Sequence, residues 1–144
     1  MAAINQKRVL LGAVVAGVIW NAWGLVIEMG LLGQERYAAA QQKGLFLTEE
    51  AAHYPYFLPV YILTLFLLAY GVAWAYASVR ATHGPGPKTA LKVGLWVGFA
   101  AGFPLNFALA NWLAVDRLFP FAWMLEFWVG AILAALVAGW LYKD

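Results

Sequence analysis

The stretch that decides the fold is VLLGAVVAGVIWNAWGLVIEMGLL, residues Val9–Leu32, which carries one charged residue. A helix needs about 20 apolar residues to cross the hydrocarbon core of a bilayer, and this stretch exceeds that length. If it is helical, small and polar residues recur along one face at steps of four and three: Gly17, Asn21, Gly24 and Glu28. Exposing an amide and an acid to lipid is unfavourable, and glycines allow close contact between helices. We therefore expect other helices to cover this stripe.

The composition agrees with a membrane protein. The 144 residues are 65% hydrophobic and 11% charged, whereas soluble domains average roughly 25% charged residues. The length predicts a single domain, residues 1–144. Cysteine is absent from the sequence, which excludes disulfides and thiolate chemistry. The net charge of +2 reflects basic loops flanking apolar segments, so we expect the lipid bilayer as a partner and no nucleic acid.

Four apolar segments predict an all-α fold, an integral membrane four-helix bundle. The expected spans are residues 9–32, 56–79, 93–115 and 119–142, and the one long loop, residues 33–54, follows the first span. Within this loop Thr48 precedes two glutamates, a pattern typical of an N-cap that opens a short interfacial helix.

The basic residues are divided unequally between the two ends of these spans. One end holds six: Lys7, Arg8, Arg80, Lys88, Lys92 and Lys143. The other end holds only three, Arg36, Lys43 and Arg117, together with several acids of the loops. The positive-inside bias therefore predicts that both termini lie in the cytoplasm, an N-in/C-in topology with the loop 33–54 outside.

Small residues recur at helical spacing on three of the four spans. Small residues four apart allow the backbones of membrane helices to approach closely, so they mark contact faces. We expect helix packing at the following positions: Gly17, Gly94, Gly98, Gly102, Gly130 and Ala134. This is more close-approach surface than one four-helix bundle obviously needs, which favours self-association or association with other membrane subunits.

Two short motifs resemble a group of small four-span bacterial membrane proteins of unassigned function. They are the turn HGPGPKTAL, residues His83–Leu91, and the ending AGWLYKD, residues Ala138–Asp144. A first span with a midway asparagine and a fourth span with an early glutamate belong to the same pattern. The resemblance implies four helices in the bacterial inner membrane, and it implies no activity, cofactor or partner.

Five polar residues of the spans are expected to converge toward the outer side of the bilayer. Glu28, Glu126, Asn106 and Asn111 fall in its outer third, and Asn21 lies one to two turns deeper than Glu28. A charged side chain at the bilayer centre costs about 2.5–3.5 kcal/mol on insertion scales, so the two acids need compensating contacts. Two interpretations are open. The cluster could be a vestibule that binds a cation, a proton or a small polar solute. Alternatively, each glutamate bonds an asparagine or a tryptophan N–H across the bundle and stabilises packing.

Metal, cofactor and catalytic sites are not predicted. Glu50-x-x-His53 has the spacing of half a carboxylate-bridged metal site, but the pair occurs once, so these two residues are weak candidates. The spans contain no histidine that could hold a haem or chlorophyll, and the aromatic residues are expected to fill the core or face lipid. Without a nucleophile–base pair inside the spans, we do not expect an enzyme.

Two functions remain open at this point. The first is a non-catalytic membrane protein, either a homo-oligomer or an accessory subunit of a larger membrane complex. The second is a small proton- or cation-coupled transporter with Glu28 as the titrating group. Small multidrug exporters also have four spans and an acid in the first, but Glu28 lies near the end of its span, and their glycine–proline pattern is absent here.

Overall fold

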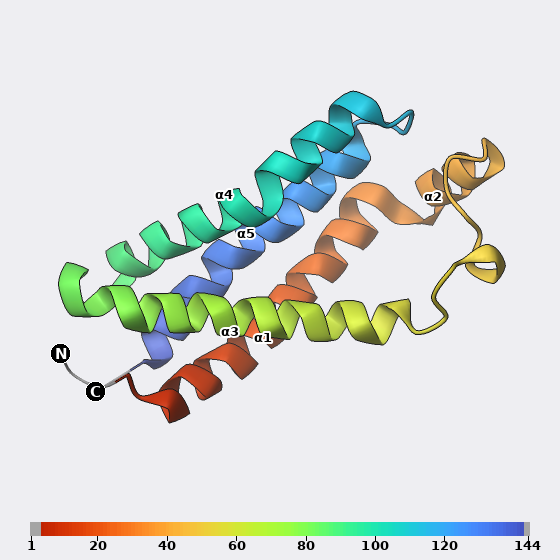
Figure 1. Cartoon of the computed structure of the whole chain (residues 1–144). Helices are drawn as coiled ribbons and strands as arrows, with labels where there is room; N and C mark the ends of the chain where they lie inside the picture. Colours follow the sequence, from red (N-terminus) through yellow and green to blue (C-terminus); the bar gives the residue numbers. More distant parts are fainter. Residues whose placement is uncertain (1–3, 143–144) are drawn as a thin grey trace.

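The protein is all-helical over the part of the chain that the computed structural model describes, residues 4–142. Figure 1 shows the helices in the order of the chain. Their bounds are α1 Gln6–Ile27, the π-helix η1 Glu28–Leu32, α2 Gly33–Gln42, the 3₁₀ helix η2 Glu49–Ala51, α3 Phe57–His83, α4 Pro87–Trp112 and α5 Leu118–Leu141. Four helices, of which α1 with η1 and α2 counts as one, are long and apolar enough to cross a membrane.

The expected outer loop is partly helical, which corrects the predicted loop boundary at residue 33. Helix α2 follows η1 directly, so the helical path from Gln6 continues to Gln42. The reason lies in the segment itself, since three consecutive alanines and two glutamines favour helix. Further along, the short helix expected after Thr48 is present as η2, although the Thr48 side chain makes no capping hydrogen bond.

Helix α5 lies at the centre of the bundle and contacts α1, α3, α4 and η1. Its buried positions are mainly alanine and glycine, which let three helices approach one backbone. Helices α1 and α4 lie on different sides of α5 and share no contact within the described part of the chain. α1 begins and α5 ends at the same end of the bundle, where the backbone N–H of Asn5 donates to the Tyr142 hydroxyl over 2.9 Å.

The glycines of α4 face the backbone of α5 at very short range. A Cβ atom added at Gly94 would lie 2.6 Å from the Cα of Ile132, and one at Gly98 would lie 2.6 Å from the Trp128 carbonyl oxygen. Gly102 meets the Met124 carbonyl oxygen at 2.9 Å in the same way. Only glycine permits this approach, so the register between α4 and α5 depends on all three.

The remaining positions expected to pack are also buried, and each contacts a helix of the same chain. Gly17 lies against the ring of Phe66 in α3, and Gly130 lies against the indole of Trp20 in α1. Ala134 is fully buried in the cluster around Trp20. These small residues therefore stabilise contacts within a single bundle.

Helix α3 diverges from the other helices toward its N-terminal end, the yellow-green end in Figure 1. Its second half is buried at several positions, beginning with Leu65. By contrast, every residue from Phe57 to Thr64 is exposed except Tyr61, which is half-buried. The N-terminal half of α3 is therefore largely exposed, and Tyr61 is its half-buried residue, whereas the C-terminal half packs into the bundle.

The turn between α3 and α4 is held by polar contacts to its backbone. Gly84 and Gly86 have φ values of 81° and 122°, in a region that residues with a side chain rarely adopt. The Gly86 N–H donates to the Tyr76 hydroxyl over 3.0 Å, and the Thr89 hydroxyl donates to the Gly84 carbonyl over 2.8 Å. The Gly-Pro-Gly-Pro segment thus forms a turn between α3 and α4 whose backbone is held by hydrogen bonds.

Candidate functional site

The most buried polar side chain of the described spans is Glu126 of α5, which is 1% exposed. Its Oε1 accepts a hydrogen bond from the Tyr61 hydroxyl of α3 over 2.8 Å. On the α1 side, a Cβ atom at Gly24 would lie only 2.8 Å from the same oxygen, so glycine makes the space for the carboxyl group. Three helices therefore converge on one acid.

Two tryptophans of α1 bond to the backbone of α5 beside this acid. The Trp20 indole N–H donates to the Glu126 carbonyl and the Trp23 indole N–H donates to the Leu125 carbonyl, both over 3.1 Å. These bonds set the register of α1 on α5. The sequence predicted a tryptophan N–H bonded to a glutamate side chain across the bundle, whereas the acceptors here are backbone carbonyls of α5. The signal was present, because an indole N–H inside a membrane needs an acceptor.

Glu28 begins the π-helix η1 and bonds outside the bundle core. Its Oε2 accepts from the Tyr37 hydroxyl of α2 over 2.8 Å. The Tyr37 ring packs edge-on against Phe119 of α5, with ring centroids 5.1 Å apart. Glu28 and Glu126 thus each have a tyrosine partner, whereas the structural interpretation of the sequence expected asparagine or tryptophan.

The three asparagines do not join the acids in one cluster. The side-chain amide of Asn21 donates to the Gly17 carbonyl of its own helix over 2.9 Å, and Asn106 bonds Gly102 of its own helix over 2.8 Å. Asn111 is exposed in the last turn of α4. Because α4 does not contact α1, Asn106 and Asn111 lie apart from Asn21. A single vestibule lined by all five predicted residues is therefore not formed.

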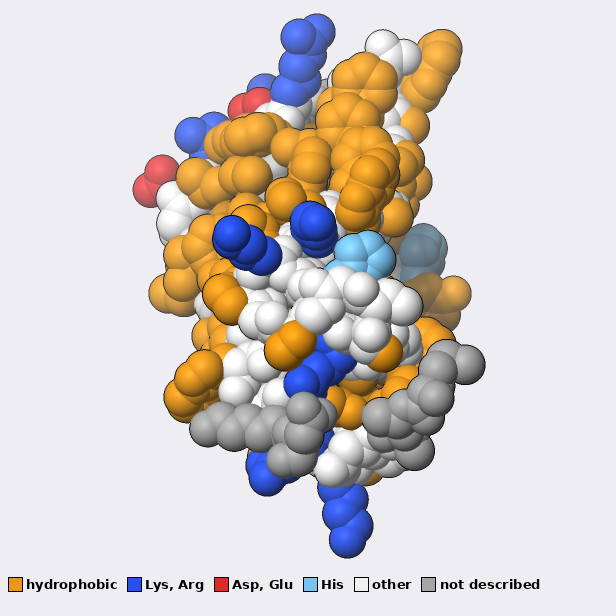
Figure 2. Space-filling model, turned by 90° about the vertical axis from the view of Figure 1, so that its left-hand side faces the viewer, with side chains coloured by type: hydrophobic (Ala, Val, Ile, Leu, Met, Phe, Trp, Pro, Cys, Tyr) orange, Lys and Arg blue, Asp and Glu red, His pale blue; other side chains and the backbone are white. Residues whose placement is uncertain are grey.

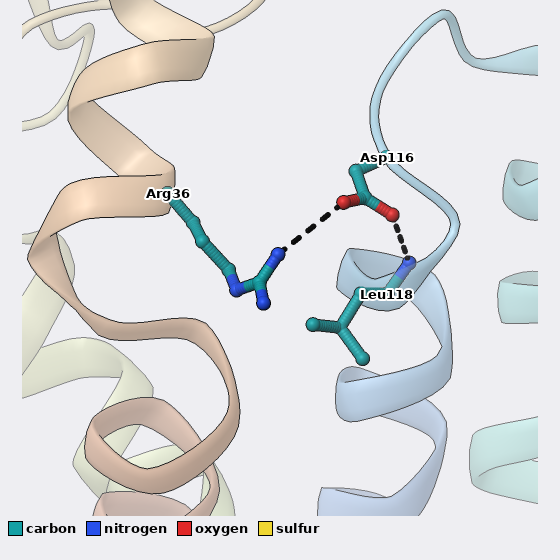
Figure 3. A network of polar contacts seen from close by, with 3 residues as sticks. All are labelled: Arg36, Asp116 and Leu118. Atoms are coloured by element: carbon teal, nitrogen blue, oxygen red, sulfur yellow. Dashed lines mark hydrogen bonds and ion pairs between the residues drawn. The ribbon is translucent and has the colours of Figure 1, made fainter.

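The segments that follow η1 and α4 carry further polar residues, of which one pair forms a salt bridge in the described chain. Arg36 of α2 contacts Asp116 at 3.5 Å, and the other carboxylate oxygen of Asp116 accepts from the Leu118 N–H at the start of α5 over 2.9 Å (Figure 3). Both charged side chains are about half exposed. Such a pair contributes at most about 1 kcal/mol, so it orients the loops more than it stabilises them.

The weak metal candidates Glu50 and His53 are both exposed in the loop before α3. Between residues 4 and 142, no three His, Cys, Asp or Glu side chains come together in a way that could hold a metal ion. The structure therefore adds no ligand to this pair.

A surface pocket reaches the partner of the buried acid. It has a volume of about 310 Å³ and is lined from the loop and the outer half of α3 by Tyr54, Tyr56, Phe57, Val60, Tyr61 and Thr64. Tyr61 therefore touches the pocket and also bonds Glu126. A tyrosine that lines an open pocket and also bonds a buried carboxyl group can couple occupation of the pocket to that group.

Comparison of the chain with models of known protein families, with curated proteins and with solved structures finds no match. The resemblance of the Gly-Pro turn and of the C-terminal motif to small four-span proteins therefore stays a prediction.

Proposed function

We propose that this protein is a non-catalytic integral membrane protein whose role is assembly, either with a second copy of itself or as an accessory subunit of a larger membrane complex. The observation that carries the proposal is Gly71 in the middle of α3. A Cβ atom added there meets nothing within 4 Å, whereas the glycines of α1, α4 and α5 all meet a neighbouring helix. Gly30 is also open, but it lies in η1 at the end of its span.

The surroundings of Gly71 have the character of a helix-packing face. Three further small residues share its face at steps of seven and four along the helix: Thr64, Ala75 and Ser78. The hydroxyl of Thr64 donates to the Val60 carbonyl and that of Ser78 donates to the Trp74 carbonyl, each over 2.9 Å. Since both hydroxyls are satisfied within α3, a partner can cover this face without leaving a polar group unpaired.

A partner helix covers such a face better than lipid does. Lipid tails are as apolar as leucine, so helices associate in a bilayer through close van der Waals contact, which small residues permit. Larger side chains, Leu67 at 63% exposed and Trp74 at 47% exposed, flank the small residues and would close around an incoming helix. The glycines of α4 and α5 are occupied within the chain, whereas Gly71 in the middle of α3 remains open to a partner.

The test is the mass of the protein purified in mild detergent, measured by light scattering. We expect the wild type to exceed the mass of one chain or to retain a co-purifying membrane subunit, and Gly71→Leu to reduce it to a folded single chain. Gly30→Leu is the matched control, because it makes the same change at a second open helical glycine, which lies away from the α3 face. A wild type that is already a lone monomer, or a Gly71→Leu variant of unchanged mass, would overturn the proposal.

A second candidate, proton- or cation-coupled transport, is favoured by the link from the surface pocket through Tyr61 to Glu126. This link makes Glu126 a better titrating group than Glu28, whose partner Tyr37 lies in α2. The test is proton release when tetraphenylphosphonium is added to the purified protein. Stoichiometric release that disappears in Glu126→Gln and persists in Glu28→Gln supports transport, and the absence of release rejects this solute as a coupled ligand.

A further inference from the structure

A second pocket lies at the end of the bundle where α1 begins and α5 ends. It has a volume of about 350 Å³, which is within the range of small-molecule sites. The end of α3, the Gly-Pro turn, the start of α4 and the last turns of α5 all contribute to its walls. Figure 2 views this end of the molecule and shows hydrophobic side chains beside the backbone of the turn. The pocket therefore lies where the predicted spans reach the edge of the apolar region.

Flat rings form most of the pocket wall. They belong to three aromatic residues and two prolines: Tyr76, Trp140, Tyr142, Pro85 and Pro87. The rings of Tyr76 and Tyr142 pack edge to face, with centroids 6.3 Å apart. Among the residues that the structure describes, no charged side chain lines the pocket. The nearby Arg80 guanidinium is engaged elsewhere, 4.7 Å from the ring centroid of Tyr142 and bonded to the Tyr142 carbonyl over 3.3 Å. The wall therefore suits a planar ligand without charge.

Two buried hydroxyl groups in this wall each have a hydrogen left to donate. Tyr76 is 1% exposed and Tyr142 is 9% exposed. The Tyr76 hydroxyl accepts from the Gly86 N–H over 3.0 Å, and the Tyr142 hydroxyl accepts from the Asn5 N–H over 2.9 Å. A phenol that accepts in this way still carries its own O–H donor. Neither O–H has an acceptor among the described residues. Because a buried donor without an acceptor is unfavourable, the pocket is suited to a ligand oxygen that accepts hydrogen bonds.

We infer that this pocket binds the ring of a membrane quinone, whose carbonyl oxygens accept from the hydroxyls of Tyr76 and Tyr142. A quinone ring is planar and neutral, and its carbonyl oxygens accept hydrogen bonds without a hydrogen to donate. It therefore matches both the flat wall and the two unused donors. The ester carbonyl of a lipid accepts the same bonds, but it brings no flat ring to the aromatic wall.

The surroundings of the pocket suit a ligand that enters from the bilayer. Trp140, which is 74% exposed, belongs to the wall, and an exposed indole at a helix end is typical of the headgroup region. Leu91 lies one helical turn beyond Pro87 and is 41% exposed, so apolar surface continues from the pocket along α4. The apolar tail of a quinone can follow this surface. The inference is independent of the α3 face and of the transport candidate.

The experiment measures how far decylubiquinone, a quinone with a short tail, raises the melting temperature of the protein purified in mild detergent. A ligand that binds the folded state raises the Tm with its concentration, so a titration gives the apparent affinity. Decylbenzene is the matched control ligand, because it has a ring and the same tail but no carbonyl. We expect decylubiquinone to raise the Tm and decylbenzene to leave it unchanged at equal concentration.

The variants Tyr76→Phe and Tyr142→Phe keep the rings and each remove one O–H. A neutral hydrogen bond contributes about a factor of two to ten in affinity, so each variant should weaken quinone binding by about that factor, and the pair by more. Each shift is measured from the variant's own Tm without ligand, which removes any change in basal stability. Tyr54→Phe/Tyr56→Phe is the matched control, because it removes two hydroxyls from the pocket at the other end and should keep the full affinity.

Four results would overturn the inference. A wild type whose Tm does not respond to decylubiquinone has no such site. An equal response to decylbenzene would show apolar partition without recognition of the carbonyl groups. Unchanged affinity in Tyr76→Phe/Tyr142→Phe, or an equal loss in the control pair, would place binding elsewhere. An equal response to dioleoylglycerol would identify a lipid ester as the occupant. None of these results affects the mass expected for Gly71→Leu, so this inference and the proposed assembly are tested separately.

Discussion

The sharpest test of the bundle is Gly98→Ala, which adds one methyl group between α4 and α5. The new Cβ atom would lie 2.6 Å from the Trp128 carbonyl oxygen and 2.9 Å from its Cα atom. Ordinary contacts to a Cβ atom lie at 3.4–4 Å, and the atoms met here belong to backbone that cannot rotate away. The two helices must therefore separate at this point by a large part of an ångström.

The size of the effect follows from this separation. A gap of about 0.5–1 Å already removes a quarter to a half of the attractive energy of a dispersion contact. Inserting a methylene into a packed core costs about 1–3 kcal/mol. Alanine also gains up to about 1 kcal/mol over glycine in a helix. Gly30→Ala is the reference, because Gly30 is also helical and an added Cβ atom there meets no atom within 4 Å. The difference in unfolding free energy between these two variants should therefore isolate the contact, at about 1–3 kcal/mol.

The assay is unfolding of both variants in the same detergent, followed by circular dichroism. For a chain of this size each kcal/mol corresponds to a shift of about 2–4 °C in Tm, so Gly98→Ala should melt several degrees below Gly30→Ala. Gly98→Leu should lower the Tm further. If Gly98→Ala melts at or above Gly30→Ala, the close approach of α4 to α5 is wrong, and so is the central position of α5.

Three further outcomes are expected. Tyr61→Phe removes the hydrogen bond to Glu126 and should lower the free energy of unfolding by about 1–3 kcal/mol. Glu126→Gln keeps an acceptor of the same shape and should lower it less. If thermal melts show the opposite order, the pairing of Tyr61 with Glu126 is contradicted. Glu28→Gln should leave the free energy of unfolding almost unchanged. Glu28→Leu should lower it by about 1–3 kcal/mol, because Tyr37 loses its acceptor. Equal melting temperatures for the two variants would argue against the bond between Glu28 and Tyr37. Cysteine placed at Gln42 should react with an impermeant maleimide in intact cells and cysteine at His83 should not, and the reverse labelling would overturn the N-in/C-in prediction.

The polar candidates show where sequence reasoning is limited. The pattern of the first span indicated that Glu28 and the glycines avoid lipid, because apolar periodicity reports which face of a helix is covered. The identity of the covering helix was not readable. Gly24 faces Glu126 of α5 and Gly17 faces Phe66 of α3, so one stripe of α1 serves two neighbours. Asn21 bonds its own helix and neither acid.

The sequence by itself determined the features that depend on local composition. Four helices of membrane length follow from runs of apolar residues, and the unequal division of basic residues follows from the loops. The tertiary structure alone decided that α5 is central, that α1 and α4 do not touch, and that tyrosines bond the two acids. It also showed that Gly71 is open while Gly98 is occupied. The physical reason is that helical periodicity repeats within each segment, whereas the partner of a face depends on how distant segments fit together, and small apolar residues fit many partners equally well.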